Sequence, residues 1–153
     1  MPIYFLDSSA VAKRYVAETG SGWVAGIMHP SAGNQLQVAG ISGVEVMAAI
    51  AKRMRSGNLS QQAAREATSQ FRADFGRIQD VVEISPQVIT RAMDLVEKHA
   101  LRGYDAVQLA SALIVHEAAT VIGLSVILVS ADDELNAAAL TEGLQVENPS
   151  LHP

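Results

Sequence analysis

Short apolar runs alternate with longer, helix-like segments along the whole chain. We predict strands from the apolar runs at residues 3–6, 35–39, 81–84 and 126–129, with a short edge strand at 144–146. The run at 126–129 is continuously apolar, which is typical of a strand that is buried on both faces. Strands that alternate with helices in this way predict an α/β fold with a mainly parallel sheet.

The segments between these runs carry the signals that start helices. Ser60 and Ser85 stand at N-cap positions, and Pro86 takes the first position of a helix. Ser8 and Ser9 are the N-cap candidates for the first helix. We predict helices at residues 10–17, 21–28, 42–55, 61–78, 86–99, 104–118 and 132–140.

Two of these helices have informative hydrophobic patterns. The helix at 42–55 has one apolar face at helical spacing, which comprises Val44, Met47, Ile50, Ala51 and Met54. The helix at 104–118 is apolar on most of its sides. Because such a helix needs cover all round, we expect it to be central in the fold.

The composition limits the class of protein. The chain has 153 residues, 49% of them hydrophobic, so we expect residues 1–153 to form a single domain with a sizeable core. It has no cysteine, which favours a reducing, cytoplasmic setting. No apolar run approaches the roughly 20 residues of a membrane span, and the first residues lack a signal-peptide pattern. We therefore expect no membrane association.

The formal net charge of −5 argues against a broadly basic surface for nucleic acid. The distribution of charge matters more than the total. If four of the 16 acidic residues gather in one site, the remaining 12 nearly balance the 11 Lys and Arg residues. An acidic pocket with basic flanks is therefore compatible with the overall charge.

Four acidic residues share a position relative to the predicted strands. Asp7 ends the first strand, and Asp132 follows the fourth. Glu45 and Asp105 each lie in the first turn of a predicted helix. The carboxyl ends of parallel strands and the helix N-termini that follow them meet at one edge of a sheet. We therefore expect the four side chains to gather at that edge.

Carboxylates gathered in this way repel one another unless a cation neutralises them. Oxygen ligands suit hard divalent cations, so the set predicts a site for Mg²⁺ or Mn²⁺.

Each acid also has a structural explanation. Ser42 and Glu45 have the spacing of a capping box, and Ser130 with Asp133 has the spacing of an N-cap. Asp105 is favoured in a first turn by the helix dipole, and Asp7 could cap the helix behind its strand. Caps account for a carboxylate at a helix start, but not for acids that end strands between long apolar runs.

Four segments carry a family resemblance. They are YFLDSSAVAKRY at residues 4–15, GVEVMAA at 43–49, LRGYDAVQLASA at 101–112 and VSADDEL at 129–135, and they spread over nearly the whole chain. In this order they closely resemble the motifs of PIN-domain toxins of the VapC family. The first and third segments are quite specific.

The resemblance implies a PIN-like, three-layer α/β/α fold with a small, mainly parallel sheet of four to five strands. It also implies a Mg²⁺- or Mn²⁺-dependent endoribonuclease, the toxin of a VapBC-type toxin–antitoxin pair. Such an enzyme would cleave RNA phosphodiester bonds with a metal-activated water.

The same resemblance assigns residues to the site. The catalytic and metal-binding acids would be Asp7, Glu45, Asp105 and Asp132. Asp133 stays an alternative to Asp132 as the fourth ligand. Ser8 and Ser130 match positions at which the family commonly has a small hydroxyl residue near the site.

RNA must reach an acidic site, so basic neighbours are candidates to bind it. They are Lys13, Arg14, Lys52, Arg53, Arg55 and Arg102. Each could instead simply solvate a helix face. Aromatic residues make up only 5% of the chain, so we expect base stacking to be a minor contribution.

The resemblance further implies protein partners. A cognate VapB-like antitoxin would lie in a groove among the N-terminal helices, and homodimers are common in the family.

Two other functions remain open, and one is disfavoured. A PIN nuclease that acts in RNA processing rather than as a toxin would have the same domain. A PIN module that binds RNA or protein without cutting is expected to have lost one of the acids. A receiver-like phosphotransfer domain needs an acceptor Asp after the third strand and a Lys after the last, and neither follows residues 81–84 or 126–129.

Overall fold

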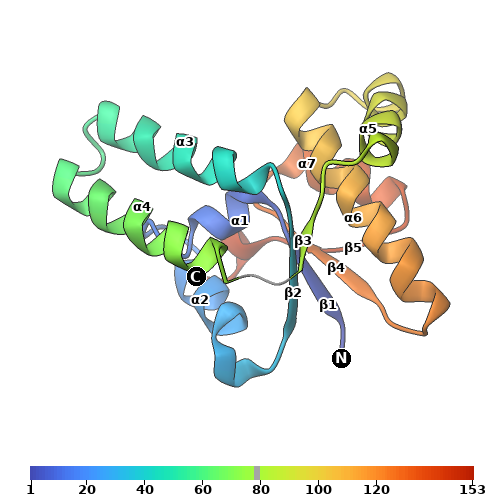
Figure 1. Ribbon diagram of the computed structural model, residues 1–153, viewed down its shortest axis with the longest axis horizontal. Coiled ribbons are helices and arrows are strands. Elements are labelled where there is room, and N and C mark those ends of the chain that lie inside the picture. Colours follow the sequence, from blue (N-terminus) through green and yellow to red (C-terminus); the bar gives the residue numbers. More distant parts are fainter. Residues whose placement is uncertain (78–79) are drawn as a thin grey trace.

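The structure, a computed structural model, describes residues 1–77 and 80–153 (Figure 1). The strands are β1 (Ile3–Leu6), β2 (Gln35–Ala39), β3 (Val81–Val82), β4 (Val126–Val129) and β5 (Gln145–Glu147). The helices are α1 (Ser8–Ala12), α2 (Ser21–Met28), α3 (Ser42–Arg55), α4 (Gln61–Phe75), α5 (Pro86–Lys98), α6 (Gly103–Val121) and α7 (Asp133–Thr141), with short 3-10 turns at Pro30–Ala32 and Pro149–Leu151.

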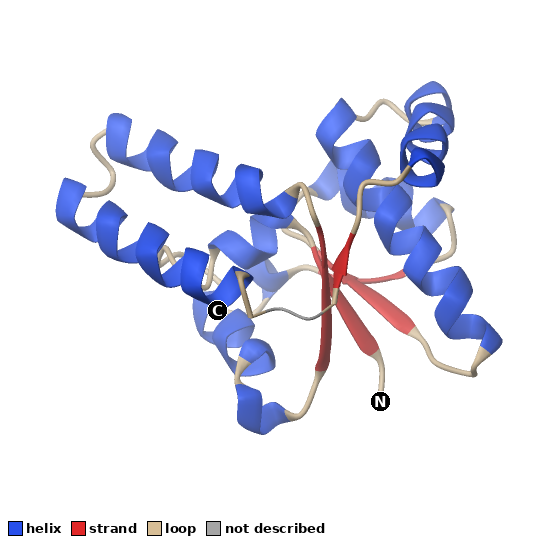
Figure 2. Cartoon of the chain, viewed as in Figure 1, coloured by secondary structure: helices blue, strands red, loops and turns tan. Residues whose placement is uncertain are grey.

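Helices cover both faces of one five-stranded parallel sheet, whose order is β3-β2-β1-β4-β5 (Figure 2). Helices α1 to α4 lie on one face, and α5 to α7 lie on the other. The side chains of β1 alternate between the two cores, since Phe5 packs among α5 to α7 and Leu6 packs among α1, α3 and α4. The predicted three-layer α/β/α fold with a mainly parallel sheet is confirmed.

The central strand β1 sets the edge of the sheet at which the acids were expected. It pairs with β2 and β4 so that Leu6 is level with both Val38 and Val129. The backbone N–H of Asp7 still donates to the carbonyl of Val129, at 3.1 Å. Asp7 and Ser130 therefore leave the sheet side by side.

Several predicted elements are confirmed at their predicted positions, including β1, β2, β4, α2 and α3. Ser60 and Ser85 are N-caps as predicted, and each accepts a hydrogen bond from the backbone N–H three residues on. The end of the predicted helix at 61–78 lies partly outside the described residues, and α4 itself ends at Phe75.

The helix α6 is central, as its apolar pattern predicted. Every residue from 108 to 113 is buried, and the helix contributes the largest share of the core on its side of the sheet. Neither α6 nor any other helix in residues 1–77 and 80–153 combines the length and hydropathy needed to cross a bilayer.

The predicted start and length of the first helix are wrong. It runs from Ser8 to Ala12, and its N-cap is not Ser8 or Ser9 but Asp7, which confirms the structural explanation of that acid. The cap forms because Oδ1 of Asp7 accepts a hydrogen bond from the N–H of Ala10, at 3.0 Å.

Three further predictions need correction. The third strand is two residues long, because the chain turns where the N–H of Ser85 donates to the carbonyl of Glu83. The edge strand lies one residue later than predicted, at Gln145–Glu147, and Leu144 instead packs into the core. The helices predicted at 104–118 and 132–140 run over 103–121 and 133–141.

The predicted apolar face of α3 is only partly right. Ile50 is buried as expected, but Val44 is 72% exposed. The buried positions are Ser42, Val46 and Ile50, because α3 packs against α1 and α4 at once. This orientation of α3 determines which residues the side chain of Glu45, in its first turn, can contact.

Candidate active site

Asp7 is buried at the end of β1 and holds its carboxylate in a fixed set of hydrogen bonds. Its Oδ1 accepts from Oγ of Ser9 at 2.7 Å and from the N–H of Ala10 at 3.0 Å, and its Oδ2 accepts from Oγ of Ser130 at 3.0 Å. Burial raises the pKa of Asp7 to about 6, although these hydrogen bonds lower it and the charge of Glu45 adds to the increase. The carboxylate is therefore fixed in place and binds a proton more readily than an exposed Asp.

Asp105 lies in the first turn of α6 and is partly exposed. Burial raises its pKa, and so do the negative charges of Asp132 and Glu45. The charge of Arg102 lowers it, and Glu134 contributes a smaller increase. Together with the effect of Glu45 on Asp7, this shows that acids from four separate segments lie close enough to repel one another.

Glu45 contacts α6 rather than capping its own helix. Its Oε1 accepts a hydrogen bond from Nε2 of Gln108 at 2.8 Å, and the same Nε2 donates to Oγ of Ser42 at 2.9 Å. The N-cap of α3 is Ile41, which makes no side-chain capping bond. The capping box that the spacing of Ser42 and Glu45 offered does not form, so the structural explanation of Glu45 is wrong.

Asp132 and Asp133 differ in their surroundings. Asp132 is partly buried and caps α7, with Oδ1 accepting from the N–H of Leu135 at 3.0 Å. Asp133 is exposed, and its Oδ1 lies 3.4 Å from Nδ2 of Asn148. Of these two adjacent acids, Asp132 is the one whose negative charge raises the pKa of Asp105. The geometry therefore favours Asp132 as the fourth acid.

Two hydroxyl groups join the ends of β1 and β4. Ser130 is fully buried, donates to Asp7 and accepts from the N–H of Asp132 at 3.1 Å. Ser9 donates to Asp7 and accepts from the N–H of Ala131 at 2.9 Å. The structure thus brings the predicted Ser130 to the acids, and it places Ser9 rather than the predicted Ser8 against Asp7.

Two buried amides behind the acids were not identified from the sequence. Gln108 is 1% exposed and holds Glu45, and Asn136 is 8% exposed and donates from Nδ2 to the carbonyl of Ser130 at 2.9 Å. Gln108 follows Asp105 by three residues and Asn136 follows Asp132 by four. An amide at this spacing faces the same side of the helix as the acid, which is the signal that could have found both.

The predicted basic residues fall into two groups. Lys13 is 6% exposed, and its Nζ lies 2.8 Å from the carbonyl of Thr19 and 3.2 Å from Oε1 of Glu18. Arg53 pairs with the same Glu18, so these two cations connect the segment after α1 to α3. The other basic residues near the motifs keep exposed side chains, namely Arg14, Lys52, Arg55 and Arg102.

The donor chemistry of the four acids fits a hard divalent cation. All the donor atoms are carboxylate oxygens, and the pKa values of Asp7 and Asp105 are raised first by burial and then by neighbouring negative charge, both of which a cation would offset. With the side chains as they lie, no three of the Asp, Glu and His residues in the described ranges converge closely enough to bind one ion. The four acids therefore fit a divalent cation by the type of their donor atoms and not by the present positions of their side chains.

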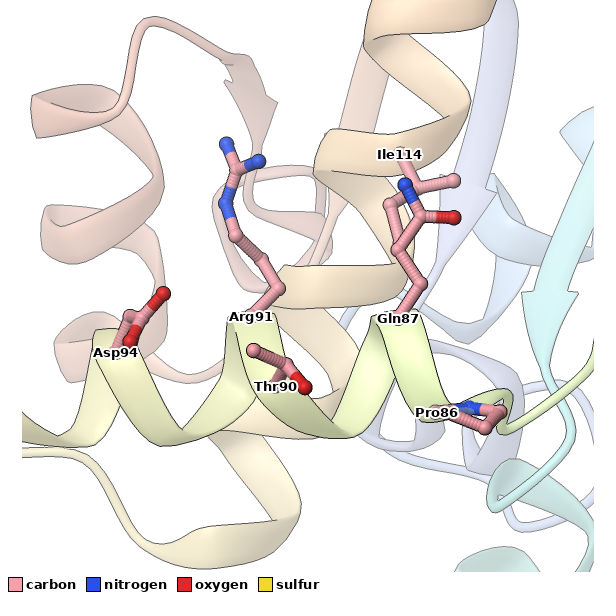
Figure 3. Close-up of a pocket in the computed structure, with 6 residues that line it drawn as sticks. All are labelled: Pro86, Gln87, Thr90, Arg91, Asp94 and Ile114. Carbon is pink, nitrogen blue, oxygen red and sulfur yellow. The ribbon is translucent and has the colours of Figure 1, made fainter.

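A separate pocket lies between α5 and α6 (Figure 3). Its lining consists of Pro86, Gln87, Thr90, Arg91, Asp94 and Ile114. Arg91 also donates to Oε1 of Glu117 at 2.8 Å. None of the four acids lines this pocket, so it is distinct from the candidate active site.

Two bacterial proteins are similar to the chain from end to end. They are ribonuclease VapC45 of Mycobacterium tuberculosis (strain CDC 1551 / Oshkosh) and ribonuclease VapC49 of M. tuberculosis (strain ATCC 25618 / H37Rv). Each is 32% identical over 153 residues, which is the whole of both chains. No family model matches the sequence.

Solved structures share the fold at lower sequence identity. The VapBC2 structure from Rickettsia felis, bound to a DNA fragment from its promoter, superposes with a TM-score of 0.62 at 12% identity, over 95% of this chain and 98% of that chain. PAE2754 from Pyrobaculum aerophilum superposes with a TM-score of 0.63 at 21% identity, over 98% and 85% of the two chains. A toxin–antitoxin complex from Klebsiella pneumoniae gives 0.54 at 18% identity, over 95% and 97%.

Proposed function

Since the chain belongs to the VapC family of ribonucleases, we propose that it is a toxin endoribonuclease whose active site lies at the carboxyl edge of its sheet. One observation carries the assignment of the site. Asp7, Glu45, Asp105 and Asp132 come from separate segments of the chain, and the charge of Glu45 raises the pKa of Asp7 while those of Asp132 and Glu45 raise the pKa of Asp105. Residues 1–153 would act as one catalytic domain, in the cytoplasm, where its RNA substrate is made.

The four acids would hold Mg²⁺ or Mn²⁺. Such an ion would supply positive charge next to the scissile phosphate and lower the pKa of the attacking water. Asp7 serves as the rigid member, because Ser9 and Ser130 fix both of its oxygens. Asp105 is partly exposed, so one of its oxygens would be open to accept a hydrogen bond from the attacking water and then its proton. The water oxygen would form a bond to phosphorus, the bond from phosphorus to the leaving oxygen of the RNA would break, and the leaving oxygen would take a proton from solvent.

The test is cleavage of RNA by the purified chain under controlled metal content. We expect bacterial total RNA to be cut in Mg²⁺ or Mn²⁺ and left intact in EDTA, with activity restored when the metal is added back. The variant Asp105→Asn should be folded and inactive under the same conditions. Full activity in EDTA, or equal activity of the variant, would contradict the proposal.

We further propose that the chain is inhibited by a VapB-like antitoxin. Two of the structures that share its fold are toxin–antitoxin complexes. A pocket of about 450 Å³ between α4, β2 and the segment after α1 supports a binding groove among the N-terminal helices, and Arg14, Tyr15, Gln70 and Asp74 are among the residues that line it. Co-expression with the product of an adjacent small gene should give a stable complex that no longer cuts RNA.

A homodimer is the remaining proposal on partners. Its support is a set of apolar side chains exposed on α5, namely Ile89, Met93 and Val96. Light scattering of the purified chain should give twice the mass of the monomer. The variant Met93→Glu, placed at the most exposed of the three positions, should shift that mass to the monomer's value.

A further inference from the structure

Gln108 is a buried amide that connects the helix of Asp105 to the helix of Glu45. It lies on α6 with 1% of its surface exposed. Its Nε2 donates to Oε1 of Glu45 at 2.8 Å and to Oγ of Ser42 at 2.9 Å. Because an amide nitrogen carries two hydrogens, both are used, and both go to residues of α3.

The other end of the same amide has no such partner. Oε1 of Gln108 is buried and accepts no hydrogen bond from the residues that the structure describes. A buried acceptor without a partner destabilises a fold. Rotating the amide by half a turn would direct the carbonyl oxygen at the Glu45 carboxylate, so that two acceptors faced each other. The charge of Glu45 therefore fixes the orientation of the amide, even though one oxygen is left unpaired.

Packing alone does not require a glutamine at this position. Its neighbours on α6 from Leu109 to Leu113 are mostly apolar, and an apolar side chain of similar length would fill the space without a buried, unpaired oxygen. Gln108 leaves a buried oxygen without a partner and in return holds Glu45, which points to a role for that contact in function.

The hydrogen bond from Gln108 can orient the Glu45 carboxylate without removing its negative charge. A Glu side chain has three rotatable bonds, and holding it in one conformation costs conformational entropy. A Lys or Arg in place of Gln108 would orient the carboxylate but also neutralise it. A neutral amide orients the carboxylate and leaves its negative charge available.

We propose that Gln108 is the positioning residue that presents Glu45 to the divalent cation of the site. The proposal rests on the proposed function, because it takes Glu45 to be one of the metal-binding acids. Hydrogen-bonded partners behind metal ligands typically contribute about 10- to 100-fold to metal affinity or activity.

The experiment is a calorimetric titration of the purified chain with Mn²⁺, which needs no knowledge of the RNA target. The test variant is Gln108→Met, which keeps the side-chain volume and removes both the donor and the unpaired acceptor. We expect Mn²⁺ affinity to fall about 10- to 100-fold in a chain that stays folded. Its melting temperature should fall, because Ser42 and Glu45 lose their donor. In RNA cleavage at a fixed metal concentration, kcat should fall while KM stays unchanged.

The matched control is Ser111→Ala. Ser111 is also a buried polar residue of α6, but its Oγ donates within the helix to the carbonyl of Val107 at 2.8 Å. This variant should bind Mn²⁺ as the wild type does. A second test variant, Gln108→Leu, guards against a specific misfit of Met.

Two results would overturn the inference. One is wild-type Mn²⁺ affinity in a folded Gln108→Met or Gln108→Leu chain. The other is loss of folding in both variants, because Gln108 would then serve the core. A wild-type chain that binds no Mn²⁺ is a different result, since it contradicts the proposed function itself and this inference with it.

Discussion

Ser130 donates a hydrogen bond from Oγ to Oδ2 of Asp7 at 3.0 Å, across a separation of 123 residues in the sequence. The same oxygen accepts from the N–H of Asp132. One hydroxyl group therefore connects two of the four acids. The contact follows from the sheet, because parallel pairing brings the ends of β1 and β4 level with each other.

Replacing this hydroxyl should destabilise the protein. In Ser130→Ala, a buried oxygen of Asp7 and the N–H of Asp132 lose a partner, so we expect the free energy of unfolding to fall by about 1–3 kcal/mol. Urea unfolding at neutral pH measures the change. Ser8→Ala is the control, since Ser8 is only partly buried, and it should stay within about 0.5 kcal/mol of the wild type. Equal stability of the two variants would show that the contact contributes nothing.

The variant Asp7→Asn should be inactive yet more stable than the wild type at pH 8 in EDTA. The pKa of Asp7 is raised from 3.8 to about 6 on folding, so the folded chain favours the protonated carboxyl. The stability from this preference is complete below the unfolded pKa and is lost as the pH rises through about 6. A shift of this size corresponds to at most roughly 3 kcal/mol. Asparagine mimics the neutral form at every pH.

The pH dependence gives the measurement. Between pH 4 and 8 in EDTA, the wild type should lose stability in urea unfolding and Asp7→Asn should lose less. The difference between the two curves should grow from about pH 4 to about pH 6 and stay constant at higher pH. Curves that run parallel over this range would rule out a raised pKa at Asp7.

The paired variants Asp132→Asn and Asp133→Asn distinguish the two adjacent acids. We expect Asp132→Asn to lose RNA cleavage, because the charge of Asp132 acts on Asp105, while its amide oxygen can still cap α7. Asp133→Asn should keep near-wild-type activity, since Asp133 is exposed and contacts Asn148. Thermal melts of both variants would confirm that they fold. The reverse pattern of activity would assign the site to Asp133.

Much of the fold was predictable because it depends on local patterns. The continuously apolar run at 126–129 indicates a strand that is buried on both faces. Ser85 followed by Pro86 indicates the start of a helix, with Ser85 as its N-cap. The sequence left the start of α1 open among three caps. Ser8, Ser9 and Asp7 were all candidates, and Asp7 takes the role because the sheet holds it in place.

The site was predictable at the level of its acids and not of their neighbours. Asp7 and Asp105 stand in specific motifs, whereas Gln108 and Asn136 look like ordinary polar residues of a helix until α3 and β4 are placed beside them. Glu45 shows the opposite case, since its local spacing offered a capping box that the packing of α3 against α6 prevents. Long-range contacts decide these roles, and single-sequence patterns do not contain them.

Lys13 and Arg102 should respond differently to removal of their charge, although both flank the motifs. Lys13 is buried against Glu18 and the carbonyl of Thr19, so Lys13→Met should lower stability by about 1–3 kcal/mol and leave RNA affinity unchanged in the folded chain. Arg102 is exposed, and its charge reaches Asp105. Arg102→Ala should therefore keep the wild-type stability and bind RNA more weakly.

The slope of log RNA affinity against log salt concentration should become shallower by about 0.7–1 in Arg102→Ala, which is the contribution of one phosphate contact. Fluorescence anisotropy in EDTA measures binding without cleavage, and an unchanged salt dependence for Arg102→Ala would place the RNA path elsewhere on the surface.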